Sequence, residues 1–170
     1  FYNKFIGTYG FSGSFIVTKN GKIISEKYQG FANQRTKELI TVNTPLHLAS
    51  VSKVLTATAI LKLVDNDNIM LDQKVTDWLP SFPYKSTTIR TLLNHRSGLT
   101  NYAYYFDDTK KWNHDKQLTN QDILDTFIKY DAPLDYNTGQ RFAYCNTNYA
   151  MLALIIEKVT KMSYRNAMAE

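Results

Sequence analysis

The sequence lacks several features that would each indicate a particular class of protein. It has a single cysteine, Cys145, which excludes an internal disulfide and a cysteine-only metal cage. No apolar run reaches the roughly 18 residues that predict a membrane-spanning helix. The formal net charge is +5, but the basic residues are spread along the chain, so no nucleic-acid-binding arm is indicated. His47 and His114 lack metal-ligand spacing, and we expect neither a cofactor nor a metal.

The composition is that of an ordinary globular protein, with 170 residues of which 44% are hydrophobic. Asn20-Gly21 lies between two β-rich runs and predicts a β-hairpin. Residues 31–49 are interpreted as a connecting loop, because no convincing further strand follows the hairpin. We therefore divide the chain into residues 1–49, a hairpin with its connection, and residues 50–170, a mostly helical lobe.

The helices of that lobe are predicted from apolar periodicity, capping residues and turn residues. The expected helices are residues 50–65, 87–98, 119–130 and 147–160, and Ser163 can cap one more. The segment between the second and third helices is interpreted as a polar, aromatic loop. Its large aromatic side chains are interpreted as loop packing, with the rim of a cleft as the alternative: Tyr102, Tyr104, Tyr105, Phe106 and Trp112.

The first helix raises a chemical question. From Val54 to Val64 it is apolar or small on nearly every side, which predicts a helix buried all round. Its first turn nevertheless holds Ser50 and Lys53, and a lysine there opposes the helix dipole. Residues three apart share a helix face, so Lys53 can hold Ser50 and take its proton, while the free N–H groups of the first turn can donate to an oxyanion. The alternative is an N-capping serine and a lysine that reaches water.

Three ordered segments together resemble a known superfamily. They are "HLASVSKVLTATAILKLVDNDNIMLDQKVTDWLP", "TLLNHRSGLTNY" and "FAYCNTNYAMLALIIEKVTKMSY". They are similar to the serine β-lactamases and penicillin-binding proteins, and most similar to the branch of class C β-lactamases and D-alanyl-D-alanine carboxypeptidases. The resemblance implies an α+β fold of the β-lactamase/transpeptidase type, in which the N-terminal hairpin starts an antiparallel sheet beside a mostly helical lobe.

The resemblance also implies roles for four residues. Ser50 would be the acyl-accepting nucleophile and Lys53 its proton partner. Tyr144 would be the general base or share that work, helped by the positive charge of Lys53 because a free phenol titrates near ~10. Asn146 would bind the acyl-amide group of the substrate and hydrogen-bond Lys53. The alternative for Tyr144 is a buried, hydrogen-bonded core tyrosine.

Two further polar motifs receive structural interpretations. His95 is a candidate for the base of a catalytic triad. By the resemblance of its segment to the family, it is instead interpreted as a structural histidine that braces the loop through Ser97 and Gly98. A second Tyr-x-Asn, formed by Tyr164 and Asn166, is discounted because it lies in a predicted helix outside the matching segment.

The sequence departs from the family in two ways. Thr138 and Lys161 stand where the family usually has proline and glycine, and Arg96 replaces a usual threonine. The chain also stops at Glu170, before the strands and the third motif that close the family's fold, and these are the strands that a two-stranded hairpin needs. One hypothesis is therefore that the chain is part of a longer protein, with a C-terminal segment that completes it.

We predict a serine hydrolase that acts through an acyl-enzyme on amide or ester bonds, such as a D-alanyl-D-alanine peptide, a β-lactam or a related substrate. The expected partner is this small-molecule or peptidoglycan-peptide substrate, with no nucleic acid and no membrane span in the chain. A truncated, non-catalytic binding or scaffold module is one alternative. Another is an unrelated α+β domain in which Ser50 and Lys53 are only a cap and a surface charge. The family implies an extracytoplasmic location, and a chain that begins at Phe1 suggests that a leader was removed.

Overall fold

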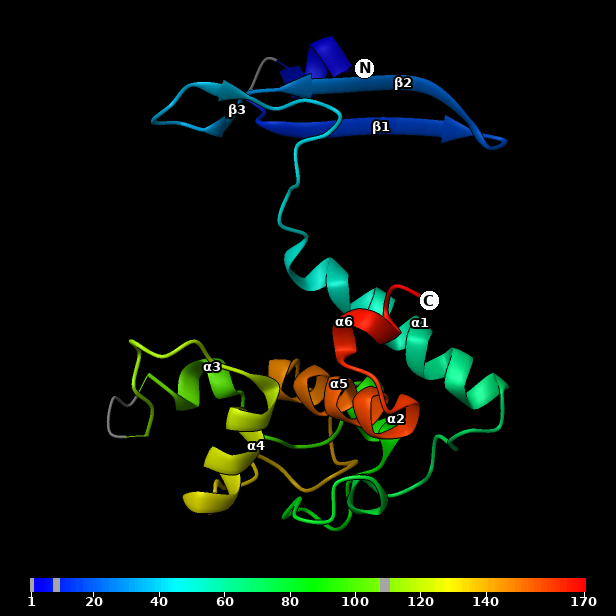
Figure 1. Ribbon diagram of the computed structural model, residues 1–170, viewed down its shortest axis with the longest axis vertical. Helices are drawn as coiled ribbons and strands as arrows, with labels where there is room; N and C mark the ends of the chain where they lie inside the picture. The colour runs from blue at the N-terminus through cyan, green and yellow to red at the C-terminus, as the bar shows by residue number, and fades with distance from the viewer. Residues whose placement is uncertain (1, 8–9, 108–110) are drawn as a thin grey trace. The chain divides into compact units, whose positions relative to one another are not determined.

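The computed structural model describes residues 2–7, 10–107 and 111–170. Its contacts divide the chain into two compact units, Phe1–Ala49 and Ser50–Glu170, here named the β unit and the helical unit. Figure 1 shows all strands in the first unit and helices α1 to α6 in the second.

The β unit is organised around the predicted hairpin. A π-helical turn, Tyr2–Ile6, precedes strands β1 (Gly13–Lys19) and β2 (Lys22–Gln29), which pair antiparallel. Asn20 and Gly21 have φ angles of 52° and 73°, the left-handed pair that a tight two-residue hairpin turn requires. The hairpin prediction is therefore confirmed.

The prediction of an unbroken loop over residues 31–49 is wrong in part. Strands β3 (Phe31–Asn33) and β4 (Glu38–Leu39) form a second antiparallel pair. The Asn33 side chain accepts the backbone N–H groups of Arg35 and Thr36, and this closes the turn between the strands. The pairing depends on that local turn and not on an alternating apolar pattern, so strand periodicity does not predict it.

The helical unit packs around one central helix, α5, which contacts each of the other five helices. Every residue of α5 from Ala150 to Ile156 is buried, which confirms the predicted apolar helix. The helices are α1 (Ser52–Asp65), α2 (Ile89–Leu93), α3 (Tyr102–Tyr105), α4 (Asn120–Lys129), α5 (Asn146–Thr160) and α6 (Tyr164–Ala167), with 3-10 turns at Ala49–Val51 and Val75–Asp77.

Capping side chains set several helix starts. Thr119 accepts the backbone N–H of Asp122 at the start of α4. Ser163 accepts the backbone N–H of Asn166 at the start of α6, as predicted. Helix α3 was predicted as loop, and that prediction is wrong because Asn101 acts as its N-cap. The aromatic residues around α3 are mostly packing: Phe106 is buried, Tyr102, Tyr105 and Trp112 lie against the core, and Tyr104 is 75% exposed.

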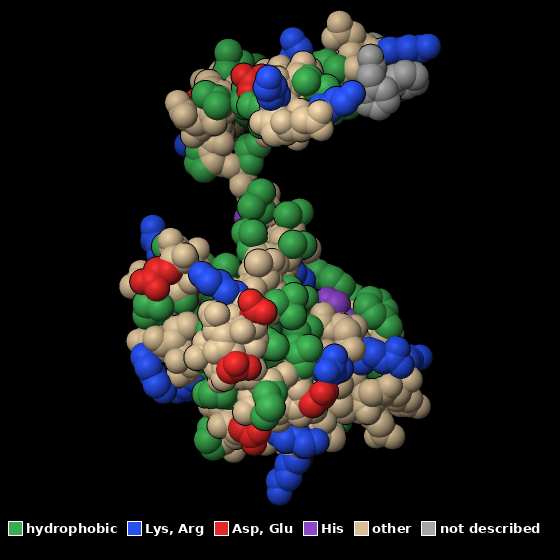
Figure 2. Space-filling model, turned by 90° about the vertical axis from the view of Figure 1, so that its right-hand side faces the viewer, with side chains coloured by type: hydrophobic (Ala, Val, Ile, Leu, Met, Phe, Trp, Pro, Cys, Tyr) green, Lys and Arg blue, Asp and Glu red, His purple; other side chains and the backbone are tan. Residues whose placement is uncertain are grey.

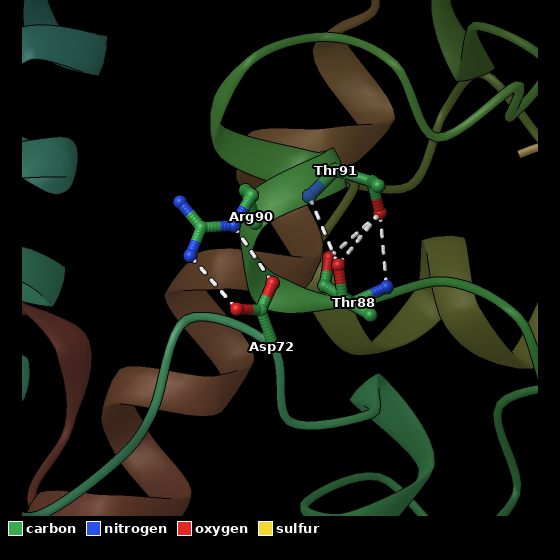
Figure 3. Close-up of polar contacts among 4 residues, drawn as sticks. All are labelled: Asp72, Thr88, Arg90 and Thr91. Carbon is green, nitrogen blue, oxygen red and sulfur yellow. Dashed lines mark hydrogen bonds and ion pairs between the residues drawn. The ribbon is translucent and has the colours of Figure 1, made fainter. Parts of the chain in front are cut away.

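Helix α2 is fixed at its start by reciprocal threonine bonds. Thr88 accepts the backbone N–H of Thr91 at 3.2 Å, and Thr91 Oγ1 accepts the backbone N–H of Thr88 at 2.9 Å. The Arg90 guanidinium donates two bonds to Asp72, at 2.7 and 2.8 Å (Figure 3). These bonds attach the loop after α1 to α2, whose C-terminal end leads into the segment of His95.

The prediction that helix α1 is buried all round is wrong. Thr56 and Ile60 are buried against α5, while Val54, Leu55 and Leu61 are 64%, 51% and 50% exposed. Among the described residues of the helical unit, no element covers this second apolar face. Figure 2 shows hydrophobic side chains gathered on the surface of the helical unit.

Candidate active site

Ser50 lies in the 3-10 turn Ala49–Val51, immediately before α1. Its neighbour Ala49 has a φ of 47°, a left-handed conformation that costs a non-glycine residue about 1–3 kcal/mol. The N-cap of α1 is Val51, and no side chain caps the helix. The hydroxyl of Ser50 is therefore free of the capping role that was the alternative interpretation.

Lys53 follows one turn later and points back to Ser50. Its Nζ donates to Ser50 Oγ at 3.2 Å and lies 5.0 and 5.7 Å from the ring centroids of Tyr144 and Tyr149. In the described part of the chain no carboxylate forms an ion pair with it. The ammonium thus opposes the helix dipole, and the serine hydroxyl and two aromatic rings are its partners.

Tyr144 completes the cluster, although it is 94 positions away from Ser50 in the sequence. It lies in the extended segment before α5, and its hydroxyl is 2.6 Å from Ser50 Oγ. The side chain is 49% exposed, so Tyr144 is not a buried core tyrosine. The interaction with Lys53, and after it the hydrogen bond with Ser50, lower the pKa of Tyr144 below its usual value. Ser50, Lys53 and Tyr144 therefore form one compact group of a hydroxyl, an ammonium and an acidified phenol.

Asn146 is the first residue of α5 and is half-buried. No hydrogen bond of its side chain occurs within the described residues, so its amide is available to a ligand. The predicted bond from Asn146 to Lys53 is not present, because α5 begins at Asn146 and its backbone leaves the extended line that Tyr144 follows.

His95 packs against the ring of Tyr144 and forms no hydrogen bond with Ser50. Its Nδ1 is 3.2 Å from the backbone nitrogen of Cys145 and 3.3 Å from the amide nitrogen of Asn148. Burial lowers the pKa of His95, and the charge of Lys53 lowers it further. These contacts agree with a bracing residue and give no role as a triad base.

The sequence reasoning missed Asn148, which is fully buried. Its Oδ1 accepts the hydroxyl of Ser97 at 2.6 Å, and that hydroxyl oxygen accepts the backbone N–H of Leu99 at 3.1 Å. An asparagine at a core position of an otherwise apolar helix is a signal for such a network. Gly98 passes close to the carbonyl of Tyr136 with a φ of 81°, a conformation that favours glycine.

The second Tyr-x-Asn has a structural role, since Tyr164 lies in α6 with its hydroxyl 2.6 Å from Thr56 Oγ1. Within residues 2–7, 10–107 and 111–170, no group of three histidine, cysteine, aspartate or glutamate side chains could hold a metal ion. The same residues include no helix long and apolar enough to cross a membrane.

Comparison with known families identifies this arrangement. A family model described as "Beta-lactamase" matches residues 4–170. The chain belongs to the beta-lactamase family. The predicted superfamily and fold are thereby confirmed, while the class C branch stays a prediction.

Three relatives show how far the similarity extends. Penicillin-binding protein 4* of Bacillus subtilis is 37% identical over 154 residues, which are 91% of this chain and 34% of that protein. A penicillin binding protein from Bacillus halodurans is 29% identical with a TM-score of 0.79, covering 93% of this chain and 48% of that one. D-amino acid amidase from Ochrobactrum anthropi is 27% identical with a TM-score of 0.73, covering 91% and 41%. The chain therefore spans less than half the length of these relatives.

Proposed function

We propose that this chain carries the nucleophile and proton-transfer groups of a serine hydrolase that cleaves amide or ester bonds through an acyl-enzyme. Ser50 is the nucleophile, Lys53 its proton partner and Tyr144 the general base. The observation that carries the proposal is the cluster itself: Ser50 Oγ lies 2.6 Å from the Tyr144 hydroxyl and 3.2 Å from Lys53 Nζ. Both distances are within reach of direct proton transfer.

The reaction follows from these positions. Ser50 Oγ attacks the substrate carbonyl carbon while its proton passes to the Tyr144 phenolate. The neighbouring ammonium of Lys53 lowers the pKa of Tyr144, because positive charge favours the ionised phenol. The proton then goes to the leaving amine or alcohol as its bond to the carbonyl carbon breaks. In the second half, water attacks the carbonyl carbon of the resulting ester and gives one proton to Tyr144. That proton passes to Ser50 Oγ as the bond between Oγ and the carbonyl carbon breaks, which releases the acid and restores the serine.

Substrate contacts come in part from this chain. The amide of Asn146, which no side chain of the described residues occupies, binds the acyl-amide group of the substrate. Backbone N–H groups at the start of α1 have no intrahelical acceptor, and in this proposal they donate to the oxyanion. A penicillin-binding protein and a D-amino acid amidase among the relatives support an amide of a D-amino acid or a β-lactam as the substrate class.

We further propose that a C-terminal segment supplies the remaining strands of the sheet. Two observations support this. Both described sheets have only two strands, and α1 exposes Val54, Leu55 and Leu61 on one face, an apolar surface that water does not favour. We also propose a location outside the cytoplasm, at the cell envelope, which the penicillin-binding proteins among the relatives support.

The test is the intact mass of the protein that contains this chain, before and after incubation with a β-lactam and, separately, a fluorophosphonate. We expect one adduct, mapped to Ser50 by peptide sequencing. Ser50→Ala should abolish it, whereas the matched control Ser52→Ala, at an exposed serine two residues away in α1, should leave it unchanged. Tyr144→Phe should slow its formation by about 10²- to 10⁴-fold without loss of folding, because the Tyr144 side chain is half-exposed.

Two outcomes would contradict the proposal. Labelling at another residue would remove Ser50 from the role of nucleophile. No adduct on a folded protein, with the C-terminal segment present, would favour the alternative of a non-catalytic binding or scaffold module.

A further inference from the structure

His95 holds both residues that flank Tyr144. The backbone N–H of Ala143 donates to the His95 carbonyl oxygen at 2.8 Å. On the other side, the backbone N–H of Cys145 donates to His95 Nδ1 at 3.2 Å. One residue thus fixes, by its backbone and its side chain, the peptide groups before and after the phenol.

The imidazole also packs directly on the phenol. Its centroid is 4.6 Å from that of the Tyr144 ring with an angle of 36° between the planes, and 5.2 Å from that of the Tyr149 ring. The Phe142 ring contacts the imidazole in an edge-to-face arrangement, with centroids 5.8 Å apart and an angle of 81° between the planes. The Tyr144 ring is otherwise half-exposed, so this packing restricts a side chain that has few other contacts.

The hydrogen bonds determine the tautomer of His95. A backbone N–H can only donate, so Nδ1 must carry a lone pair toward Cys145. Asn148 agrees with this assignment: its oxygen accepts from Ser97, so its NH₂ group faces Nδ1. The ring is therefore neutral with its hydrogen on Nε2, and a proton on Nδ1 would break the bond to Cys145.

The surroundings favour that neutral form. Lys53 faces the ring from α1, Tyr149 faces it from α5, and Tyr144 and Cys145 face it from the segment between α2 and α5. No carboxylate is among these groups, and the ammonium of Lys53 disfavours a second positive charge on the imidazole.

The backbone of His95 is held in an uncommon conformation. Its φ is 57°, in the left-handed region that asparagine tolerates better than most residues. An asparagine here would also place an oxygen near the position of Nδ1. The site therefore offers a conservative replacement that keeps the acceptor and removes the ring.

We propose that His95 is a positioning residue, whose neutral Nε2–H imidazole fixes the Tyr144 hydroxyl beside Ser50 through the bond from the Cys145 N–H to Nδ1. This inference rests on the proposed function and deepens it. His95 transfers no proton to or from the substrate. It acts only through the place of Tyr144, where a displacement of about 1 Å can cost about 10²-fold in rate.

The first experiment compares His95→Asn with His95→Phe in the protein that contains this chain. The rate of Ser50 acylation by a fluorophosphonate should stay within about threefold of wild type in His95→Asn, and fall by about 10- to 100-fold in His95→Phe. Phenylalanine keeps a ring for packing but offers no acceptor to Cys145, so the pair separates the hydrogen bond from the ring contact.

A second readout is independent of labelling. Tyrosine carrying ¹³C at the ζ carbon reports phenol ionisation by NMR, and the Tyr144→Phe spectrum assigns its signal. In wild type and His95→Asn the pKa of Tyr144 should lie below the usual value for tyrosine. In His95→Phe it should rise toward that value, because the phenol moves away from Lys53 and Ser50.

The pH profile tests the inference even if His95→Phe fails to fold. Acylation by wild type needs both Tyr144 and His95 unprotonated, so the logarithm of the rate should fall with a slope of 1 and then approach 2 at lower pH. His95→Asn has no imidazole to protonate and should keep a slope of 1 throughout. Equal slopes in the two proteins would overturn the inference.

Other results would also overturn it. A folded His95→Phe with unchanged rate and unchanged Tyr144 pKa would show that His95 does not position Tyr144. Equal losses in both variants would show that the Nδ1 bond is not the cause. If wild type takes no adduct at all, the proposed function fails, while the Tyr144 pKa comparison still decides whether His95 positions the phenol.

Discussion

Replacing Asn148 by alanine should destabilise the helical unit strongly, whereas the same change at Asn146 should not. Both asparagines lie in the first turn of α5, two residues apart. Asn148 is fully buried and accepts the Ser97 hydroxyl, while the Asn146 side chain is half-buried without a hydrogen bond inside the described residues. The pair thus matches one structural and one proposed substrate-binding residue of the same type on the same helix.

The expected loss of stability in Asn148→Ala follows from the unpaired Ser97 hydroxyl and the void that the substitution creates. Ser97 is 1% exposed and its hydroxyl would lose its acceptor, which costs about 1–3 kcal/mol for a buried polar group. The void left by the amide adds about 1 kcal/mol. Together the free energy of unfolding should fall by about 2–4 kcal/mol, a large part of the ~5–15 kcal/mol typical of a domain. Asn146→Ala should change it by less than about 0.5 kcal/mol.

The assay is urea unfolding followed by the helical circular dichroism signal, together with the acylation rate of Ser50. We expect Asn148→Ala to lower the midpoint at an unchanged slope, and Asn146→Ala to keep the midpoint while it slows acylation. The reasoning would be refuted by a loss below 1 kcal/mol at Asn148, or by equal losses of stability at the two positions.

Three further predictions concern backbone strain and pH. Lys161 ends α5 with a φ of 60°, so Lys161→Gly should raise the free energy of unfolding by about 0.5–1 kcal/mol in the same urea assay, and a decrease would contradict the strain. Gly98→Ala should destabilise the protein by more than 2 kcal/mol, about the upper range of single substitutions, since its Cβ would collide with the Tyr136 carbonyl oxygen; a melting temperature equal to that of wild type would refute this. The pKa of His95 is lowered in the folded protein, so the unfolded chain binds the proton first and stability should fall as pH drops from about 7 through the usual histidine range of ~6.5. His95→Asn should remove that slope, which unfolding curves between pH 7 and pH 5 would show.

The sequence by itself determined the local structure where one signal dominated. Asn20-Gly21 specified the tight turn between β1 and β2, because both positions need a left-handed conformation. The apolar stretch of α5 and its Thr119-capped neighbour α4 were likewise readable, since periodicity and capping act over a few residues. Helix α3 and the β3–β4 pair were missed, because each depends on one asparagine whose side chain folds back on the backbone.

The tertiary structure alone decided which of the patterned residues meet. Ser50 and Lys53 are neighbours by helical spacing, but Tyr144 is 94 positions away from Ser50, and only the packing of α1 against α5 brings their hydroxyls to 2.6 Å. The same packing gave Asn148 its partners and placed His95 behind the phenol. The burial of α1 also depends on which elements pack against it. Its sequence is apolar on nearly every side, but one face is exposed because no described element of the helical unit covers it. Hydrogen bonds between distant segments, and the burial of side chains, depend on how the helices pack. A local sequence pattern does not specify that packing.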